Sequence, residues 1–129
     1  MSGAPFLSFA DAAAACRSYV AEMERMPWVG PDEVAFQRER AERFEQAAAM
    51  GLDIPRDLFL SFGADHMAYL LTAPIPAGTV ASRQAGAWDC NDPEGFESYG
   101  RLLDIVRGES AEVRAGRGKG WRFYPRPPA

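Results

Sequence analysis

The stretch Pro55–Thr72, "PRDLFLSFGADHMAYLLT", decides the fold class of this chain. Apolar residues alternate with their neighbours in each half of it, at Leu58, Leu60, Phe62, Met67, Tyr69 and Leu71. Such alternation is typical of half-buried strands, and Gly63-Ala64-Asp65 between the halves is suited to a turn. The stretch therefore predicts a β-hairpin, although its first half, Pro55–Phe62, can also form a short buried helix.

Two helices are predicted before this hairpin and one after it. The first begins after Ser8, a good capping residue, and ends by Pro27, because the residue before a proline is biased out of the helical region. The second spans Pro31 to about Met50, with proline at its first position. The third follows Asp92, which can cap it ahead of a proline, and stops at Gly108.

Further strands are predicted at three places in the second half of the chain. Thr79–Gln84 is the first of them, and Ala111–Ala115 with Trp121–Tyr124 forms a closing hairpin, followed by a proline-rich extended tail at about 125–129. The expected fold class is therefore α+β, with two N-terminal helices and one later helix packed on a small antiparallel sheet of about four or five strands. The 129 residues are expected to form a single domain, 1–129.

Composition and charge limit the classes of function. No window approaches the roughly 18 consecutive apolar residues of a membrane span, and the N-terminus lacks the basic region of a signal peptide, so a cytoplasmic location is expected. Residues 1–100 carry a net charge of −8 and residues 101–129 a net charge of +4. The acidic body argues against a general nucleic-acid binder. One lysine beside 13 arginines is typical of GC-rich bacterial genomes.

The stretch Ala87–Phe96, "AWDCNDPEGF", contains the strongest candidate for a reactive residue. Cys90 lies just before a predicted helix start, a place that favours a thiolate, but the neighbouring acids Asp89 and Asp92 oppose its ionisation. The residues are instead expected to form a turn and a helix cap, with the thiol packed as a small apolar group. The alternative is a Cys-His enzyme in which Cys90 is the nucleophile, His66 the base and Asp65 the orienting acid.

Neither a metal nor a cofactor is expected. A structural zinc site usually takes four cysteine or histidine ligands, whereas the chain contains two cysteines and one histidine. Both thiols, Cys16 and Cys90, are expected to be reduced in the cytoplasm.

The basic C-terminal stretch and the charged second helix supply the candidate binding residues. The candidates are Arg117, Lys119, Trp121, Arg122, Tyr124, Arg38 and Glu42. Aromatic and basic residues in the C-terminal stretch can hold phosphates and stack on bases, so a nucleotide or single-stranded nucleic-acid binder is a second alternative. The alternation of these residues fits a half-buried strand better, and Trp, Tyr and Arg are also frequent in protein-binding hot spots.

Arg38 and Glu42 lie one turn apart on the second helix and are expected to pair on its exposed face. The function expected from these features is that of a small, acidic, non-catalytic protein-binding domain, of the inhibitor, immunity or secretion-chaperone type. Its expected partner is another protein, such as a basic toxin or effector.

Overall fold

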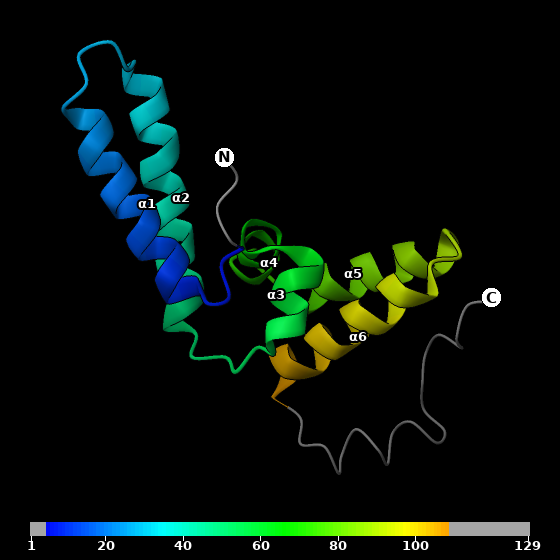
Figure 1. Ribbon diagram of the computed structural model, residues 1–129. Helices are drawn as coiled ribbons and strands as arrows, with labels where there is room; N and C mark the ends of the chain where they lie inside the picture. Colours follow the sequence, from blue (N-terminus) through cyan, green and yellow to red (C-terminus); the bar gives the residue numbers. More distant parts are fainter. Residues whose placement is uncertain (1–4, 109–129) are drawn as a thin grey trace. The chain divides into compact units, whose positions relative to one another are not determined.

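The computed structural model describes residues 5–108, and every regular element in that part of the chain is a helix (Figure 1). The helices are α1 (Phe9–Glu24), α2 (Pro31–Ala49), α3 (Arg56–Phe62), α4 (Ala64–Leu71), α5 (Pro76–Asp89) and α6 (Pro93–Arg107). The prediction of an α+β fold on an antiparallel sheet is therefore wrong. The chain divides into two compact units, Met1–Thr72 and Ala73–Ala129. The prediction that 1–129 is a single domain stays a prediction.

The stretch Pro55–Thr72 forms α3 and α4 instead of the expected hairpin. On α4 the buried residues recur at helical spacing. In a strand they would point to both faces of the sheet, whereas on the helix they lie on one side. They are Ala64, Met67, Ala68, Leu70 and Leu71. Tyr69, which alternation assigned to the buried face with Met67 and Leu71, is 55% exposed. Because apolar residues are so dense here, they satisfy both periods, and alternation alone could not distinguish a strand from a helix.

Gly63 separates α3 from α4, so the turn expected at this point does exist, but it joins two helices. Its φ of 84° and ψ of 149° lie in a region that is accessible mainly to glycine. The Gly63 amide still donates to the carbonyl of Phe59, and its carbonyl accepts from the amide of Met67. The backbone thus changes direction while the helix-end groups on both sides remain hydrogen-bonded.

The strand expected at Thr79–Gln84 lies inside α5. Pro76 takes the first turn of the helix, where its missing N–H is not needed. Val80 and Ala87 are buried seven residues apart, which is two helical turns. Pro76 therefore marks the beginning of a helix where the sequence predicted a strand.

The three predicted helices are confirmed, and the caps expected for α1 and α6 are present. The Ser8 side chain accepts from the Asp11 amide at 3.1 Å, and that of Asp92 accepts from the Gly95 amide at 3.0 Å. Gly108 ends α6 in the left-handed conformation, with φ of 71°. These ends were predictable because a cap depends on residues within one turn.

The first unit is built on an antiparallel hairpin of α1 and α2, with α4 packed against both (Figure 1). Edge-to-face ring contacts join its segments: Phe6 lies 6.4 Å from Phe44, and Phe9 lies 5.1 Å from Phe59. The buried residues of this unit include Ala12, Cys16, Val20, Met23, Ala41, Phe44, Leu58, Met67, Leu70 and Leu71. Burial of this apolar surface is the main stabilising contribution to the unit.

The second unit contains the antiparallel hairpin of α5 and α6 (Figure 1). The rings of Trp88 and Phe96 lie 6.0 Å apart, and the Gln84 amide donates to the Phe96 carbonyl at 3.4 Å. A Cβ on Gly100 would lie 2.8 Å from the Gln84 side-chain nitrogen, which is the end of a flexible side chain and can shift.

The expected strands Ala111–Ala115 and Trp121–Tyr124 and the tail at 125–129 lie outside the described residues. Over residues 5–108, no helix has the combined length and hydropathy that crossing a membrane requires.

Two glycine-to-alanine changes should affect stability in opposite directions. Gly63→Ala should lower the free energy of unfolding by about 1–3 kcal/mol, because alanine is strained at this positive φ. Gly86→Ala, inside α5, should raise it by about 0.5–1 kcal/mol, because alanine restricts the unfolded chain. A Cβ at either position meets nothing within 4 Å. Urea unfolding of both variants measures the effects, and a Gly63→Ala variant at least as stable as the unchanged protein would contradict the positive φ at the α3–α4 junction.

Candidate functional site

The side chain of Arg40 connects α2 to α4. Its Nε donates to Asp65 Oδ1 at 2.7 Å, and its Nη2 donates to Asp65 Oδ2, also at 2.7 Å. Two parallel bonds from a planar guanidinium fix orientation as well as distance. The side chains of Arg40 and Asp65 are 25% and 57% exposed, so the pair lies at the edge of the core.

The same guanidinium also reaches α1. Arg40 Nη1 donates to Cys16 Sγ at 3.4 Å and to Gln37 Oε1 at 3.4 Å. The guanidinium carbon lies 5.3 Å from the centre of the Phe44 ring, within the range of a cation–π contact. We call Cys16, Arg40 and Asp65 the Arg40 cluster. Its members come from α1, α2 and α4, so one side chain contacts all three helices.

The electrostatics of the cluster favour a charged arginine and a neutral thiol. The hydrogen bonds to Asp65 are the largest cause of the raised pKa of Arg40. Burial is the largest cause of the raised pKa of Cys16, and the nearby Arg40 charge offsets it only in part. Cys16 is thus a thiol at neutral pH and acts as a weak hydrogen-bond acceptor.

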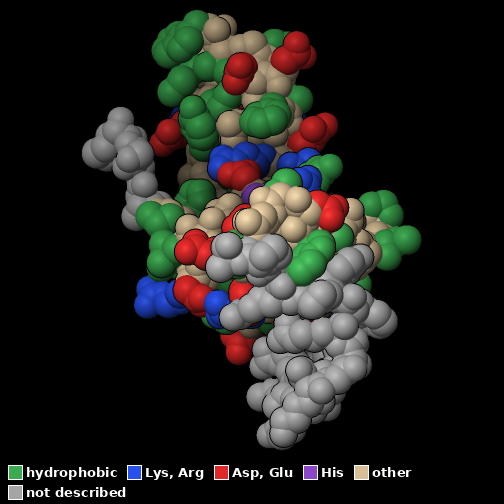
Figure 2. Space-filling view, turned by 90° about the vertical axis from the view of Figure 1, so that its right-hand side faces the viewer, with side chains coloured by type: hydrophobic (Ala, Val, Ile, Leu, Met, Phe, Trp, Pro, Cys, Tyr) green, Lys and Arg blue, Asp and Glu red, His purple; other side chains and the backbone are tan. Residues whose placement is uncertain are grey.

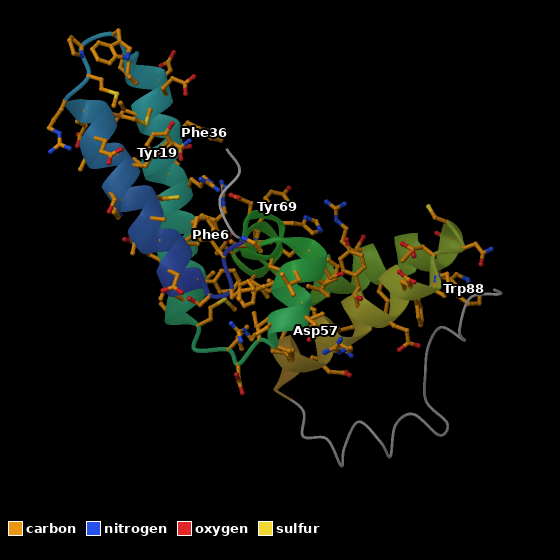
Figure 3. All side chains as sticks on the ribbon, viewed as in Figure 1. Phe6, Tyr19, Phe36, Asp57, Tyr69 and Trp88 are labelled. Atoms are coloured by element: carbon orange, nitrogen blue, oxygen red, sulfur yellow. The ribbon has the colours of Figure 1, made fainter. Side chains whose placement is uncertain are left out.

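An exposed aromatic residue lies one helical turn from each member of the Arg40 cluster. Tyr19 follows Cys16 by three residues, Phe36 precedes Arg40 by four, and Tyr69 follows Asp65 by four. Their exposed fractions are 49%, 60% and 55%. We call Tyr19, Phe36 and Tyr69 the aromatic surface; Figure 3 shows one of them on each of α1, α2 and α4.

Tyr19 and Phe36 lie on the same side of the α1–α2 hairpin. Each is displaced from the Cys16–Arg40 contact by one turn in the direction of the loop that joins the two helices. Figure 2 shows hydrophobic side chains over the hairpin, in the upper part of the view, above adjoining basic and acidic side chains. Exposed aromatic residues that surround a fixed polar group are typical of a protein-binding surface.

The other side of the hairpin carries two ion pairs between the helices. Arg17 of α1 donates to both oxygens of Glu45 of α2, at 2.9 and 2.6 Å. Arg38 of α2 donates to Glu24 of α1 at 2.7 Å. The hydrogen bonds from Arg17 are the main cause of the lowered pKa of Glu45. Because both pairs are exposed, they contribute little to the free energy of unfolding. Their main effect is to set the register of α1 against α2.

Arg38 therefore pairs with Glu24 across the hairpin, whereas the expected partner was Glu42 along the same helix. Arg38 and Glu42 each lie two residues from Arg40, and residues two apart on a helix point about 200° apart. These two candidate binding residues thus face away from the aromatic surface.

The residues of the alternative Cys-His site fall in different units. Cys90 is the C-cap residue of α5 in the second unit, and its thiol is exposed, so the expectation that it packs as an apolar group is wrong. His66 lies on α4 in the first unit, with its ring 5.9 Å from that of Phe62. Both carboxylate oxygens of Asp65 accept hydrogen bonds from Arg40. The enzyme alternative stays a prediction.

The remaining predicted binding residues lie outside the part of the chain that the structure describes. They are Arg117, Lys119, Trp121, Arg122 and Tyr124. Among residues 5–108, no group of three or more histidine, cysteine, aspartate or glutamate side chains is arranged to hold a metal ion.

The residues of the aromatic surface were not among those predicted from the sequence. In the sequence Phe36 lies off the apolar stripe of α2 that Val34, Ala41, Phe44 and Ala48 form, and this was the available signal. Tyr19 lies at helical spacing with the apolar residues Cys16 and Met23, which suggests a buried position, and Tyr69 was assigned to a strand. Arg40 was one arginine in a charged run, and its partners are 24 and 25 residues away in sequence.

The two thiols should differ in reactivity toward iodoacetamide. The variant Cys90→Ser leaves the buried Cys16, and Cys16→Ser leaves the exposed Cys90. In the folded protein Cys16 should react at least about 100-fold more slowly than Cys90. Its thiol becomes accessible only when the structure opens locally, and its pKa is raised. In urea the two rates should converge. Equal rates in the folded state would contradict the position of Cys16.

Comparison with known proteins does not assign the chain to a family. No protein-family model, curated protein or solved structure matches it. A function for the chain is therefore inferred from the exposed side chains of the aromatic surface.

Proposed function

We propose that the chain is a small, non-catalytic protein-binding domain that contacts its partner through the aromatic surface. The observation that carries this proposal is the exposure of Tyr19, Phe36 and Tyr69, one from each of the three helices that Arg40 connects. Exposed large apolar side chains on a folded domain are stabilised when a partner covers them.

The size of the aromatic side chains supports the proposal. A buried aromatic side chain removes about 150–250 Å² from water, and burial of apolar area contributes about 25 cal/mol per Å². Since about half of each side chain is still exposed here, each can contribute on the order of 1–3 kcal/mol when a partner covers it. Contributions of that size are typical of binding hot spots.

The Arg40 cluster supports the proposal in a second way. The three aromatic residues lie on helices, and the guanidinium orients those helices through bonds to Asp65 and Cys16. A surface that is already ordered loses less conformational entropy on binding. The arrangement therefore favours recognition by contact over a catalytic role for Arg40.

The inhibitor, immunity and secretion-chaperone classes share this mode of action. In each of them a small cytoplasmic protein covers part of a partner and performs no bond chemistry itself. We place the chain in this group, with a protein toxin or effector as the expected kind of partner. A general nucleic-acid partner is disfavoured by the acidity of residues 5–72, which contain 6 arginines and 11 acidic residues.

Site-specific photo-crosslinking tests the proposal. A photoreactive phenylalanine analogue placed at Phe36, Tyr19 or Tyr69 should form a crosslink to one and the same protein in cells of the native host. Leu60 is the matched control, because it is 62% exposed in the same unit but is not part of the aromatic surface. Crosslinks of equal yield from Leu60, or none from the three aromatic positions, would contradict the proposal.

A further inference from the structure

The α1–α2 hairpin extends beyond the helix that packs on it. At about 1.5 Å per residue, α1 is about 24 Å long, α2 about 28 Å and α4 only about 12 Å. The Arg40–Asp65 pair shows where α4 meets the middle of α2. The turns nearer the interhelical loop form a half of the hairpin face that carries Tyr19 and Phe36. Their side chains are 49% and 60% exposed, so the described residues cover this half-face only in part.

Carboxylates surround the two aromatic residues on this half. Glu22 lies three residues after Tyr19 on α1, while Asp32 lies four before Phe36 and Glu39 three after it on α2. All three are exposed, and none forms an ion pair with another described residue. Arg43 lies on the same side of α2. It is two turns from Phe36 in the direction away from the loop, so its charge lies outside this half of the face.

We infer that this half-face binds an amphipathic helix of the partner protein that carries lysine or arginine beside its apolar residues. The inference rests on the proposed function and specifies the partner for the same surface. A third helix packed along two others buries the apolar stripe of each in a familiar bundle geometry. Basic residues at the edges of that helix would face Glu22, Asp32 and Glu39, which attract cations to the rim of the surface.

The charge pattern also favours a basic helix over a second copy of the chain, a nucleic acid, an anionic lipid surface or an uncharged apolar helix. In a two-fold contact between copies of the chain, the carboxylates on one face would approach those on the other, and like charges disfavour such a contact. A nucleic acid or an anionic lipid surface would meet the same repulsion from its phosphates. An apolar helix without basic residues would leave the three carboxylates without partners.

The test measures the affinity of the full chain for a synthetic helical peptide by calorimetry. The peptide contains about 14 residues, with leucine at helical spacing and lysine elsewhere; a second peptide has glutamate in place of lysine. The lysine peptide should bind and the glutamate peptide should not. The triple variant Glu22→Gln, Asp32→Asn, Glu39→Gln should raise the Kd of the lysine peptide about tenfold.

A matched triple variant controls for general acidity. Asp53→Asn, Asp89→Asn and Glu94→Gln remove the same charge from exposed positions elsewhere, and should change the Kd by less than about twofold. Equal weakening by the two triple variants would overturn the inference, and so would equal binding of the two peptides. Self-association of the chain that Phe36→Ala abolishes would overturn it as well, since a second copy would then occupy the face.

The double variant Tyr19→Ala, Phe36→Ala distinguishes failure of the inference from failure of the proposed function. Both residues are exposed, so the helical content of the variant should be unchanged. If crosslinks form at Phe36 while removal of the three carboxylates leaves the Kd unchanged, the proposed function stands and the inference fails. If the double variant binds the lysine peptide as tightly as the unchanged chain and no crosslink forms at Phe36, both fail.

Discussion

The guanidinium of Arg40 is the group on which the arrangement of the first unit depends. It donates two hydrogen bonds to Asp65 on α4 and one to Cys16 on α1, and it lies over the ring of Phe44 on its own helix. A partly exposed ion pair contributes only about 0.2–1 kcal/mol to stability. Burial of Met67, Ala68, Leu70 and Leu71 contributes several times more. Arg40 therefore determines the orientation of α4, and apolar burial keeps it folded against the hairpin.

This division of roles connects the fold to the binding surface. Apolar packing alone tolerates small rotations and shifts of one helix on another, because it is not directional. A two-pronged guanidinium is directional, and here it is joined to helices that each present an aromatic residue one turn away. The opposite side of the hairpin is set in register by Arg17–Glu45 and Arg38–Glu24. The ion pairs on one side of the hairpin thus set the register of α1 and α2, while the aromatic surface on the other side is available for contact.

The sequence predicted those parts of the fold that depend on neighbouring residues. The beginnings of α1 and α6, and the end of α6 at Gly108, follow from capping groups within one turn. The sheet was wrongly predicted because the dense apolar residues of Leu58–Leu71 fit a period of two as well as the helical period. The binding surface was missed for a different reason. Whether Tyr19 is buried depends on how much of α1 the helix α4 covers, and this is set by contacts 24 or more residues apart in sequence.

Hydrogen exchange in the variants Arg40→Met and Arg17→Met tests the central role of Arg40 most directly. Each variant removes one two-pronged guanidinium from the hairpin and keeps an apolar stem in its place. In Arg40→Met, amides of α4 should exchange about two- to fivefold faster, as expected for the loss of up to about 1 kcal/mol, while those in the middle of α1 and α2 keep their protection. In Arg17→Met, α4 should exchange as in the unchanged protein. If α4 is equally protected in all three proteins, Arg40 does not hold it in place.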